Sequence, residues 1–458
     1  MKRIIFLAGL LLVCAAAHAK VEMPSIFSDN MVLQQKAQVA FWGTATGKKV
    51  TISASWTRGK TVVVPSSDGK WFVRLATPAA GGPYEICISD GEKKTLRNVL
   101  IGEVWLCSGQ SNMEMPLRGW PGQPVEHATE CIMGARPEVP IRLIDYHAGK
   151  SGGVNWQENS PEAVYEASAT AYFFACRLYE MLRVPVGIIT ASKGGSPIES
   201  WMSREILEKE FPTEINEEDD DPPAAYYDSM LSPIMPYTFK GMIWYQGEDN
   251  RRRYRKYPAL QARFVRMIRE EFQNPDAPFY FVQIAPFKYG GPDLFTSGYF
   301  YEAQQKSLEL IPHSGMVPTV DLGDINFIHP PRKMEVGQRL AMLALVNDYG
   351  FKLVNPVPPC YKDVVFEEGK ARVSVDLKGK VGLLPAKVPV GGFELAGEDR
   401  VFHPATATAF KTEIIIESAD VPAPVAVRYC FRNWAEGSLF SADGLPLPPF
   451  RTDDWDDL

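Results

Sequence analysis

The chain has 458 residues, of which 45% are hydrophobic and 22% charged, and its formal net charge is −7 at pH 7. This length predicts more than one domain, and the acidic balance argues against nucleic acid or an anionic membrane surface as a partner. The six histidines form no closely spaced pair and the seven cysteines form no Cys-x-x-Cys motif, so we expect neither a metal site nor a cofactor.

A cleavable secretory signal peptide is predicted over residues 1–19. Lys2 and Arg3 precede an apolar stretch that runs to residue 17, and Ala17-His18-Ala19 matches a cleavage signature. No later segment has the length and uninterrupted apolarity of a membrane span. We therefore expect an exported protein, periplasmic or extracellular, without a membrane-spanning segment.

Strand patterns flank a central α/β pattern. Short alternating strands separated by Gly, Ser and Pro predict a β-sandwich-like domain over residues 20–97. The α/β pattern occupies residues 98–350. After the proline-rich segment 355–359, strand patterns return and predict a second β-rich domain over residues 351–458.

The central region predicts a parallel sheet with crossover helices. Apolar runs rich in Val and Ile are typical of strands that are buried on both faces of such a sheet. The predicted strands are a run that starts at Val104 and breaks at Gly109, and residues 186–190, 241–245 and 316–320. The predicted helices are residues 167–182, 257–272, 302–310 and 333–345.

Polar side chains follow each of these strands. The first is Ser111, on the first turn of a predicted helix, where unpaired backbone N–H groups can donate to an oxyanion. An N-capping serine is the alternative. A glycine-rich turn at 194–195, an amide and a carboxylate at 246–248, and His329 follow the other three strands. The carboxyl ends of parallel strands meet at one edge, so the sequence predicts a serine esterase site there.

Four ordered motifs resemble one family. They are Gly109-Gln-Ser-Asn-Met113, Gly194-Gly-Ser-Pro-Ile-Glu-Ser-Trp201, Trp244-Tyr-Gln-Gly-Glu248, and Asp321-Leu-Gly-Asp324 with Ile328-His-Pro330. Together they resemble the sialate O-acetylesterase group of SGNH (GDSL-like) hydrolases. The resemblance implies an α/β fold of SGNH, flavodoxin-like type: a parallel sheet with helices on both faces, flanked by N-terminal and C-terminal β-sandwich-type regions.

The resemblance also implies roles for residues. Ser111 would be the nucleophile and His329 the general base. The oxyanion would be held by the backbone N–H groups of Ser111 and Gly195 and by the side-chain amide of Gln246. Asn112, beside the nucleophile, is assigned to the same oxyanion and substrate-binding group.

The acidic partner of His329 departs from the usual pattern. Many SGNH enzymes place an acid three residues before the histidine, and that residue here is Asn326. Related acetyl-xylan-type esterases resemble this chain in a Gln-Gly-Glu block, which favours Glu248 as the residue that orients His329. Asp321 and Asp324 are the alternatives, and a Ser–His dyad without an acid is a further one.

The expected substrate is an acetylated carbohydrate, with O-acetylated sialic acid favoured by the resemblance. Xylan or pectin acetyl groups are the alternative, and a non-catalytic carbohydrate-binding protein is a remote one. A sialate pocket would place a cation, such as Arg118 or one of residues 251–255, against the sugar carboxylate. Tryptophans that flank the motifs could stack on sugar faces, although such residues are more often core: Trp105, Trp120, Trp201 and Trp244. The acidic segment 217–223 is interpreted as an exposed connection.

Overall fold

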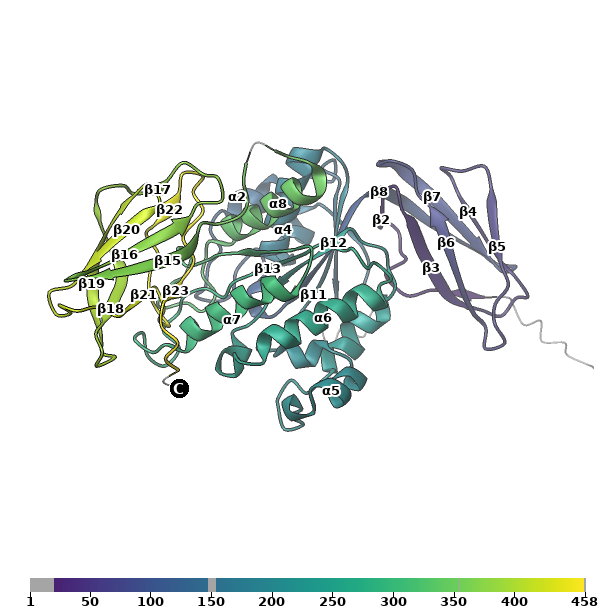
Figure 1. Ribbon diagram of the computed structural model, residues 1–458. Coiled ribbons are helices and arrows are strands. Elements are labelled where there is room, and N and C mark those ends of the chain that lie inside the picture. Colours follow the sequence, from purple (N-terminus) through teal and green to yellow (C-terminus); the bar gives the residue numbers. More distant parts are fainter. Residues whose placement is uncertain (1–19, 147–153, 353, 457–458) are drawn as a thin grey trace, which may run out of the picture.

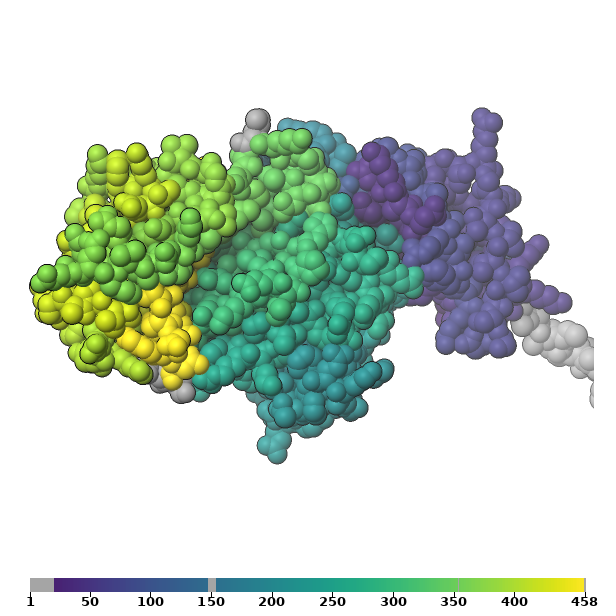
Figure 2. Space-filling model, viewed as in Figure 1, coloured from purple at the N-terminus to yellow at the C-terminus, as the bar shows by residue number. Residues whose placement is uncertain are grey.

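The computed structural model describes residues 20–146, 154–352 and 354–456. The predicted signal peptide, residues 1–19, lies outside the described residues. An N-terminal β domain and a C-terminal β domain lie at opposite ends of a central α/β domain (Figure 1). The space-filling view shows the same order, with the purple N-terminal and yellow-green C-terminal domains separated by the teal central one (Figure 2).

The N-terminal domain is built from two sheets. One has the order β1-β3-β6, and the other joins β4 to β5 and β7, β7 to β8, and β8 to β2. Burial alternates along β4, as expected for a strand with one face on a core. The strands are β1 (Val21–Glu22), β2 (Val32–Gln34), β3 (Gln38–Ala45), β4 (Val50–Ala54), β5 (Lys60–Val63), β6 (Lys70–Ala76), β7 (Gly81–Ser89) and β8 (Lys93–Gly109).

The strand β8 crosses the domain boundary that the sequence predicts between residues 97 and 98. Its first half pairs antiparallel with β7, and its second half lies between β11 and β12 in the parallel sheet. Residues from Val99 to the end of the strand are buried throughout. The change of sequence pattern therefore marks a change of neighbours along one continuous strand, and the two domains share it.

The central sheet has the order β10-β9-β11-β8-β12-β13-β14 and is parallel except for β10. Its strands are β9 (Ile141–Tyr146), β10 (Gln157–Glu158), β11 (Val186–Ser192), β12 (Gly241–Tyr245), β13 (Phe279–Val282) and β14 (Ser314–Val317). The strand predicted at residues 316–320 thus ends earlier, because Pro318 has no N–H to contribute to a strand ladder.

Helices cover both faces of this sheet. On one face α4 packs against α8 and the buried side chains of Trp105 and Cys107, and on the other α6 packs against α7 (Figure 1). The helices are α1 (Ser111–Glu114), α2 (Ala128–Gly134), α3 (Pro161–Glu166), α4 (Ala169–Leu182), α5 (Arg204–Glu210), α6 (Tyr257–Glu271), α7 (Thr296–Leu310) and α8 (Lys333–Tyr349). Among the described residues, no helix combines the length and the apolarity that crossing a bilayer requires.

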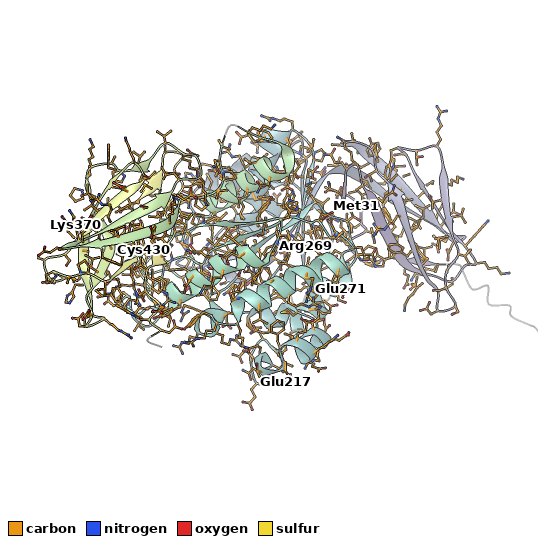
Figure 3. All side chains as sticks on the ribbon, in the orientation of Figure 1. Met31, Glu217, Arg269, Glu271, Lys370 and Cys430 are labelled. Atoms are coloured by element: carbon orange, nitrogen blue, oxygen red, sulfur yellow. The ribbon has the colours of Figure 1, made fainter. Side chains whose placement is uncertain are left out.

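The C-terminal domain has its own apolar core and a sheet of order β15-β16-β20-β19-β18-β21-β23, with a separate β17-β22 pair. Its strands are β15 (Cys360–Glu367), β16 (Lys370–Asp376), β17 (Leu383–Leu384), β18 (Pro389–Ala396), β19 (Phe402–Phe410), β20 (Glu413–Glu417), β21 (Ala426–Tyr429), β22 (Phe440–Ser441) and β23 (Phe450–Arg451). Cys430, labelled in Figure 3, is buried in this core.

A residue of the C-terminal domain caps a helix of the central one. The side-chain oxygen of Asn433 accepts hydrogen bonds from the backbone N–H of Ser297 at 2.9 Å and the hydroxyl of Thr296 at 2.7 Å, at the start of α7. This contact satisfies a helix N-terminus. The sequence predicts this helix only from residue 302, because the capping residue is remote in the chain.

Candidate active site

The chain places Ser111, Gly195 and Gln246 after three adjacent parallel strands, β8, β11 and β12. From β8 the chain proceeds first to β9 and β11 on one side, and later to β12 on the other. Open α/β sheets bind ligands outside the carboxyl ends of the strands at such a reversal of strand order. The predicted site residues therefore belong to the edge of the sheet where a ligand is expected.

Ser111 is the first residue of α1, and Gly109 makes its position possible. Gly109 has a φ of +142°, and a Cβ at this position would lie 2.1 Å from the carbonyl oxygen of Tyr245. Only glycine therefore allows β8 to end this close to β12. As the first helical residue, Ser111 has a backbone N–H without an acceptor inside the helix.

The glycine-rich turn after β11 passes beside the serine. A Cβ on Gly194 would lie 3.3 Å from the Cβ of Ser111, and the Gly194 N–H donates to a Glu114 carboxylate oxygen at 2.5 Å. Within the described part of the chain, no acceptor is assigned to the backbone N–H of Gly195, whose φ is +81°. The two backbone donors predicted for the oxyanion, on Ser111 and Gly195, thus carry no intramolecular bond.

The side chain of Gln246 does not fit its predicted role. Its amide nitrogen donates to the Ser196 carbonyl at 3.2 Å and to Asn250 Oδ1 at 2.7 Å, while its oxygen accepts from the Tyr257 hydroxyl at 2.8 Å. A fully buried amide needs internal partners, and these occupy both of its N–H groups. Gln246 therefore fixes the turn that carries Gly195 instead of offering a donor to an oxyanion.

Asn112 is likewise occupied, so its predicted part in substrate binding is not met. Its side-chain nitrogen donates to Glu248 Oε1 at 2.6 Å and to the Ile328 carbonyl at 3.2 Å, and its oxygen accepts from Lys333 Nζ at 2.5 Å. Asn112 is buried, and these three bonds use both its side-chain nitrogen and its side-chain oxygen. It joins the helix that begins at Ser111 to the end of β12 and to the loop of His329.

Glu248 lies in this network and not on His329. Its Oε1 is bonded to Asn112, and its buried Oε2 has no partner among the described residues. Burial raises the pKa of the Glu248 carboxyl, the bond from Asn112 opposing that rise. The prediction that Glu248 orients His329 is therefore not met by the structure.

The two alternative carboxylates are engaged elsewhere. Asp321 forms a two-pronged ion pair with Arg339, with N–O distances of 2.6 and 2.9 Å. Asp324 Oδ1 accepts the backbone N–H groups of Asn326 at 2.7 Å and Phe327 at 3.3 Å, which shapes the loop before the histidine. Both side chains stabilise local structure.

His329 has an amide as its partner. Its Nδ1 lies 2.5 Å from Oε1 of Gln123, and the Trp120 ring meets the imidazole edge to face with ring centroids 4.7 Å apart. Sequence reasoning missed Gln123. The Trp120-Pro-Gly-Gln123 segment has the composition of a tight turn, but nothing in it indicates which distant side chain it faces.

One residue of the acidic segment 217–223, Asp221, lies beside the glycine-rich turn of the site. Glu217 projects outward beside α5 and pairs with Arg204 at 2.6 Å, as expected of an exposed connection (Figure 3). Asp221, however, accepts a hydrogen bond from Tyr226, and its Oδ2 lies 3.6 Å from where a Cβ on Gly195 would be. The exposed interpretation is thus wrong for Asp221, which the fold brings back to the glycine turn.

Three of the four tryptophans considered as sugar platforms are fully buried: Trp105, Trp201 and Trp244. They belong to the core, and Trp120 is the one that remains partly exposed. Most of the arginines considered for a sugar carboxylate are paired. Arg118 bonds to Glu166 at 3.0 Å, and Arg251 stacks over the Tyr289 ring at 3.7 Å. The others with carboxylate partners are Arg253, with Glu199 and Asp249, and Arg255, with Asp456.

The partly buried position of His329 sets the pH range in which its imidazole is neutral. Burial, and secondarily the charge of Lys333, lowers the pKa of His329 to about 4. With the neutral imidazole in the role of base that the sequence motifs predict, kcat/KM for a soluble acetyl ester should stay level from neutral pH downward and fall only as the pH drops through about 4. A rate profile on 4-nitrophenyl acetate, with folding followed by circular dichroism at each pH, measures this. An acid limb at the ordinary histidine pKa of about 6.5 would contradict the assignment.

Comparison with known proteins identifies the class. The family model described as carbohydrate esterase, sialic acid-specific acetylesterase, matches residues 101–345. The crystal structure of a carbohydrate acetylesterase from Xanthomonas citri is similar at 34% identity and a TM-score of 0.85, covering 95% of this chain and 100% of that one. Sialate O-acetylesterases from mouse and human are each 26% identical, covering 93% of this chain and 93% and 91% of theirs.

The protein is therefore a carboxylic ester hydrolase. The chain belongs to the sialic acid-specific acetylesterase family of carbohydrate esterases.

Proposed function

We propose that this protein is an exported serine esterase that removes O-acetyl groups from carbohydrates, with O-acetylated sialic acid as its substrate. The observation that carries the serine mechanism is the placement of Ser111 at the start of α1, beside the Gly194–Gly195 turn. The sialate substrate is supported by the family description and by the curated relatives. Export rests on the signal-peptide pattern of residues 1–19.

The reaction proceeds in two stages. His329 takes the proton of the Ser111 hydroxyl as its oxygen attacks the acetyl carbon, and the backbone N–H groups of Ser111 and Gly195 stabilise the oxyanion that forms. The sugar hydroxyl leaves with the proton held by His329. Water, activated by the same imidazole, then attacks the acetyl-serine, so acetate is released and the free serine is restored.

The strand order of the central sheet supports an SGNH, flavodoxin-like assignment for the central domain. The strands β11-β8-β12-β13-β14 follow the chain order 2-1-3-4-5 when β9 and β10 are counted as an addition beyond β11. This is the flavodoxin-like order, in which ligands bind where the strand order reverses. The fold assignment and the site assignment therefore point to the same edge of the sheet.

A neutral polysaccharide, such as acetylated xylan or pectin, is a second candidate substrate. The observation that favours it is the pairing of Arg118, Arg253 and Arg255 with carboxylates, which leaves these cations engaged within the protein. Recognition of a sialate carboxylate would require an arginine that is available for two-pronged bonding.

Acetate release at equal acetyl concentration distinguishes the substrates. We expect faster release from 9-O-acetylated sialoglycans than from acetylated xylan or pectin. A clear preference for either plant polymer would replace the sialate proposal with the second candidate and leave the serine mechanism intact. The Ser111→Ala variant, run on the same substrates, reports the background.

A further inference from the structure

We propose that Gln123 positions His329 for catalysis. Its neutral amide would then orient the imidazole, a function that a carboxylate usually has in a catalytic triad. The inference rests on the proposed roles of Ser111 and His329 and deepens them. It starts from the contact between Gln123 Oε1 and His329 Nδ1.

The contact decides which ring nitrogen carries the proton. An amide oxygen can only accept a hydrogen bond, so the His329 nitrogen that meets it must be the donor. Nδ1 is then protonated in the neutral imidazole, and the lone pair of Nε2 is left as the base. A triad acid fixes the tautomer in the same way.

Gln123 is itself held in place by its backbone. Its N–H donates to the Trp120 carbonyl at 2.9 Å, and its carbonyl accepts the Trp120 N–H at 3.0 Å, which closes a tight turn. Gly119, with a φ of +73°, lies against this turn, and a Cβ there would come within 2.5 Å of the Gln123 carbonyl oxygen. The turn is therefore well defined, and it presents the side-chain amide and the Trp120 ring to the imidazole together.

A second contact joins this segment to the histidine loop. The backbone N–H of Glu126 donates to the Pro331 carbonyl at 3.0 Å, two residues beyond His329. On the other side, Asn112 bonds to the Ile328 carbonyl, one residue before it. The loop is thus fixed on both sides of His329, and Gln123 sets the direction of the ring.

The substitutions that test this are Gln123→Ala and Gln123→Glu. Loss of the amide should lower kcat on 4-nitrophenyl acetate by about tenfold to a hundredfold with KM nearly unchanged, because the base loses its orientation. A carboxylate of the same shape should preserve the hydrogen bond and favour the imidazolium. The acid limb of the rate profile should then move upward by about one pH unit or more.

The matched control is Gln157→Ala, an exposed glutamine at the edge strand β10, which should leave kcat and the pH profile as they are. A residue with only a structural role would change the thermal midpoint in both Gln123 variants without moving the acid limb. An unshifted acid limb in Gln123→Glu, in a folded protein that retains activity, would therefore overturn the inference.

Nitrogen NMR of the histidine rings gives a reading that does not depend on turnover. In the Ser111→Ala background, the His329 signals, identified by their loss in Ser111→Ala/His329→Ala, should show a proton on Nδ1 at neutral pH. Adding Gln123→Ala should abolish this preference. A proton on Nε2 with Gln123 present would contradict the proposed contact, whereas an active Ser111→Ala variant would contradict the proposed mechanism instead.

Discussion

Ser111→Ala should lower esterase turnover by about a thousandfold or more while leaving the fold intact. In the proposed mechanism the Ser111 hydroxyl oxygen forms the acetyl-enzyme, and alanine leaves only the oxyanion donors and the binding surface to act on the ester. His329→Ala should cost nearly as much, because nucleophile and base act as one unit. Both are measured as kcat on 4-nitrophenyl acetate, with folding checked by circular dichroism and thermal unfolding.

Ser203→Ala serves as the matched control for the nucleophile. Ser203 precedes α5 and its side chain makes no capping bond there, so its loss should leave turnover unchanged. Replacing a catalytic nucleophile by alanine lowers turnover by far more than tenfold. If Ser111→Ala retained more than about a tenth of the activity, another group would therefore be the nucleophile.

The largest effect on stability is expected from Asn112→Ala. This change removes the bridge between the buried Glu248 carboxyl and the buried Lys333 amino group, and it leaves both groups without that partner. A buried polar group that is left without its hydrogen-bond partner costs about 1–3 kcal/mol, and this change leaves two such groups. Turnover should fall as well, because the Ile328 carbonyl beside His329 loses its donor.

Urea unfolding of the purified protein, followed by tryptophan fluorescence, measures this loss. Asn216→Ala, an exposed position immediately before the acidic segment and outside the network, should change the free energy of unfolding by no more than about 0.5 kcal/mol. A wild-type unfolding midpoint in Asn112→Ala would show that Glu248 and Lys333 do not depend on this amide.

The arrangement around Ser111 could be predicted from the sequence because its causes are local. An apolar run that breaks at Gly109 predicts a buried strand and a tight turn, and Ser111 follows within two residues. The helices α4, α6 and α8 follow from apolar spacing in the same way, with starts within two residues of those expected. Each of these features depends on neighbours in the chain.

The partners of the buried polar side chains could not be predicted, because they come from distant segments. His329 meets Gln123, Asn112 meets Glu248, and Gln246 meets Asn250 and Tyr257. A motif shows that an amide or a carboxylate is present at a strand end. Which buried group satisfies it depends on how the loops pack, and that packing decides whether a side chain is left for the substrate.

The continuous strand β8 also has a consequence for how this protein could be rebuilt. Side chains alternate along a strand, so a slip of one residue against β7 would shift Ser111 by about 3.3 Å and turn the strand over. The pairing of β8 with β7 in the N-terminal domain thus sets the position of Ser111. A chimera with a different N-terminal domain must retain the β7–β8 register, because β8 continues from this domain into the central sheet without an interruption.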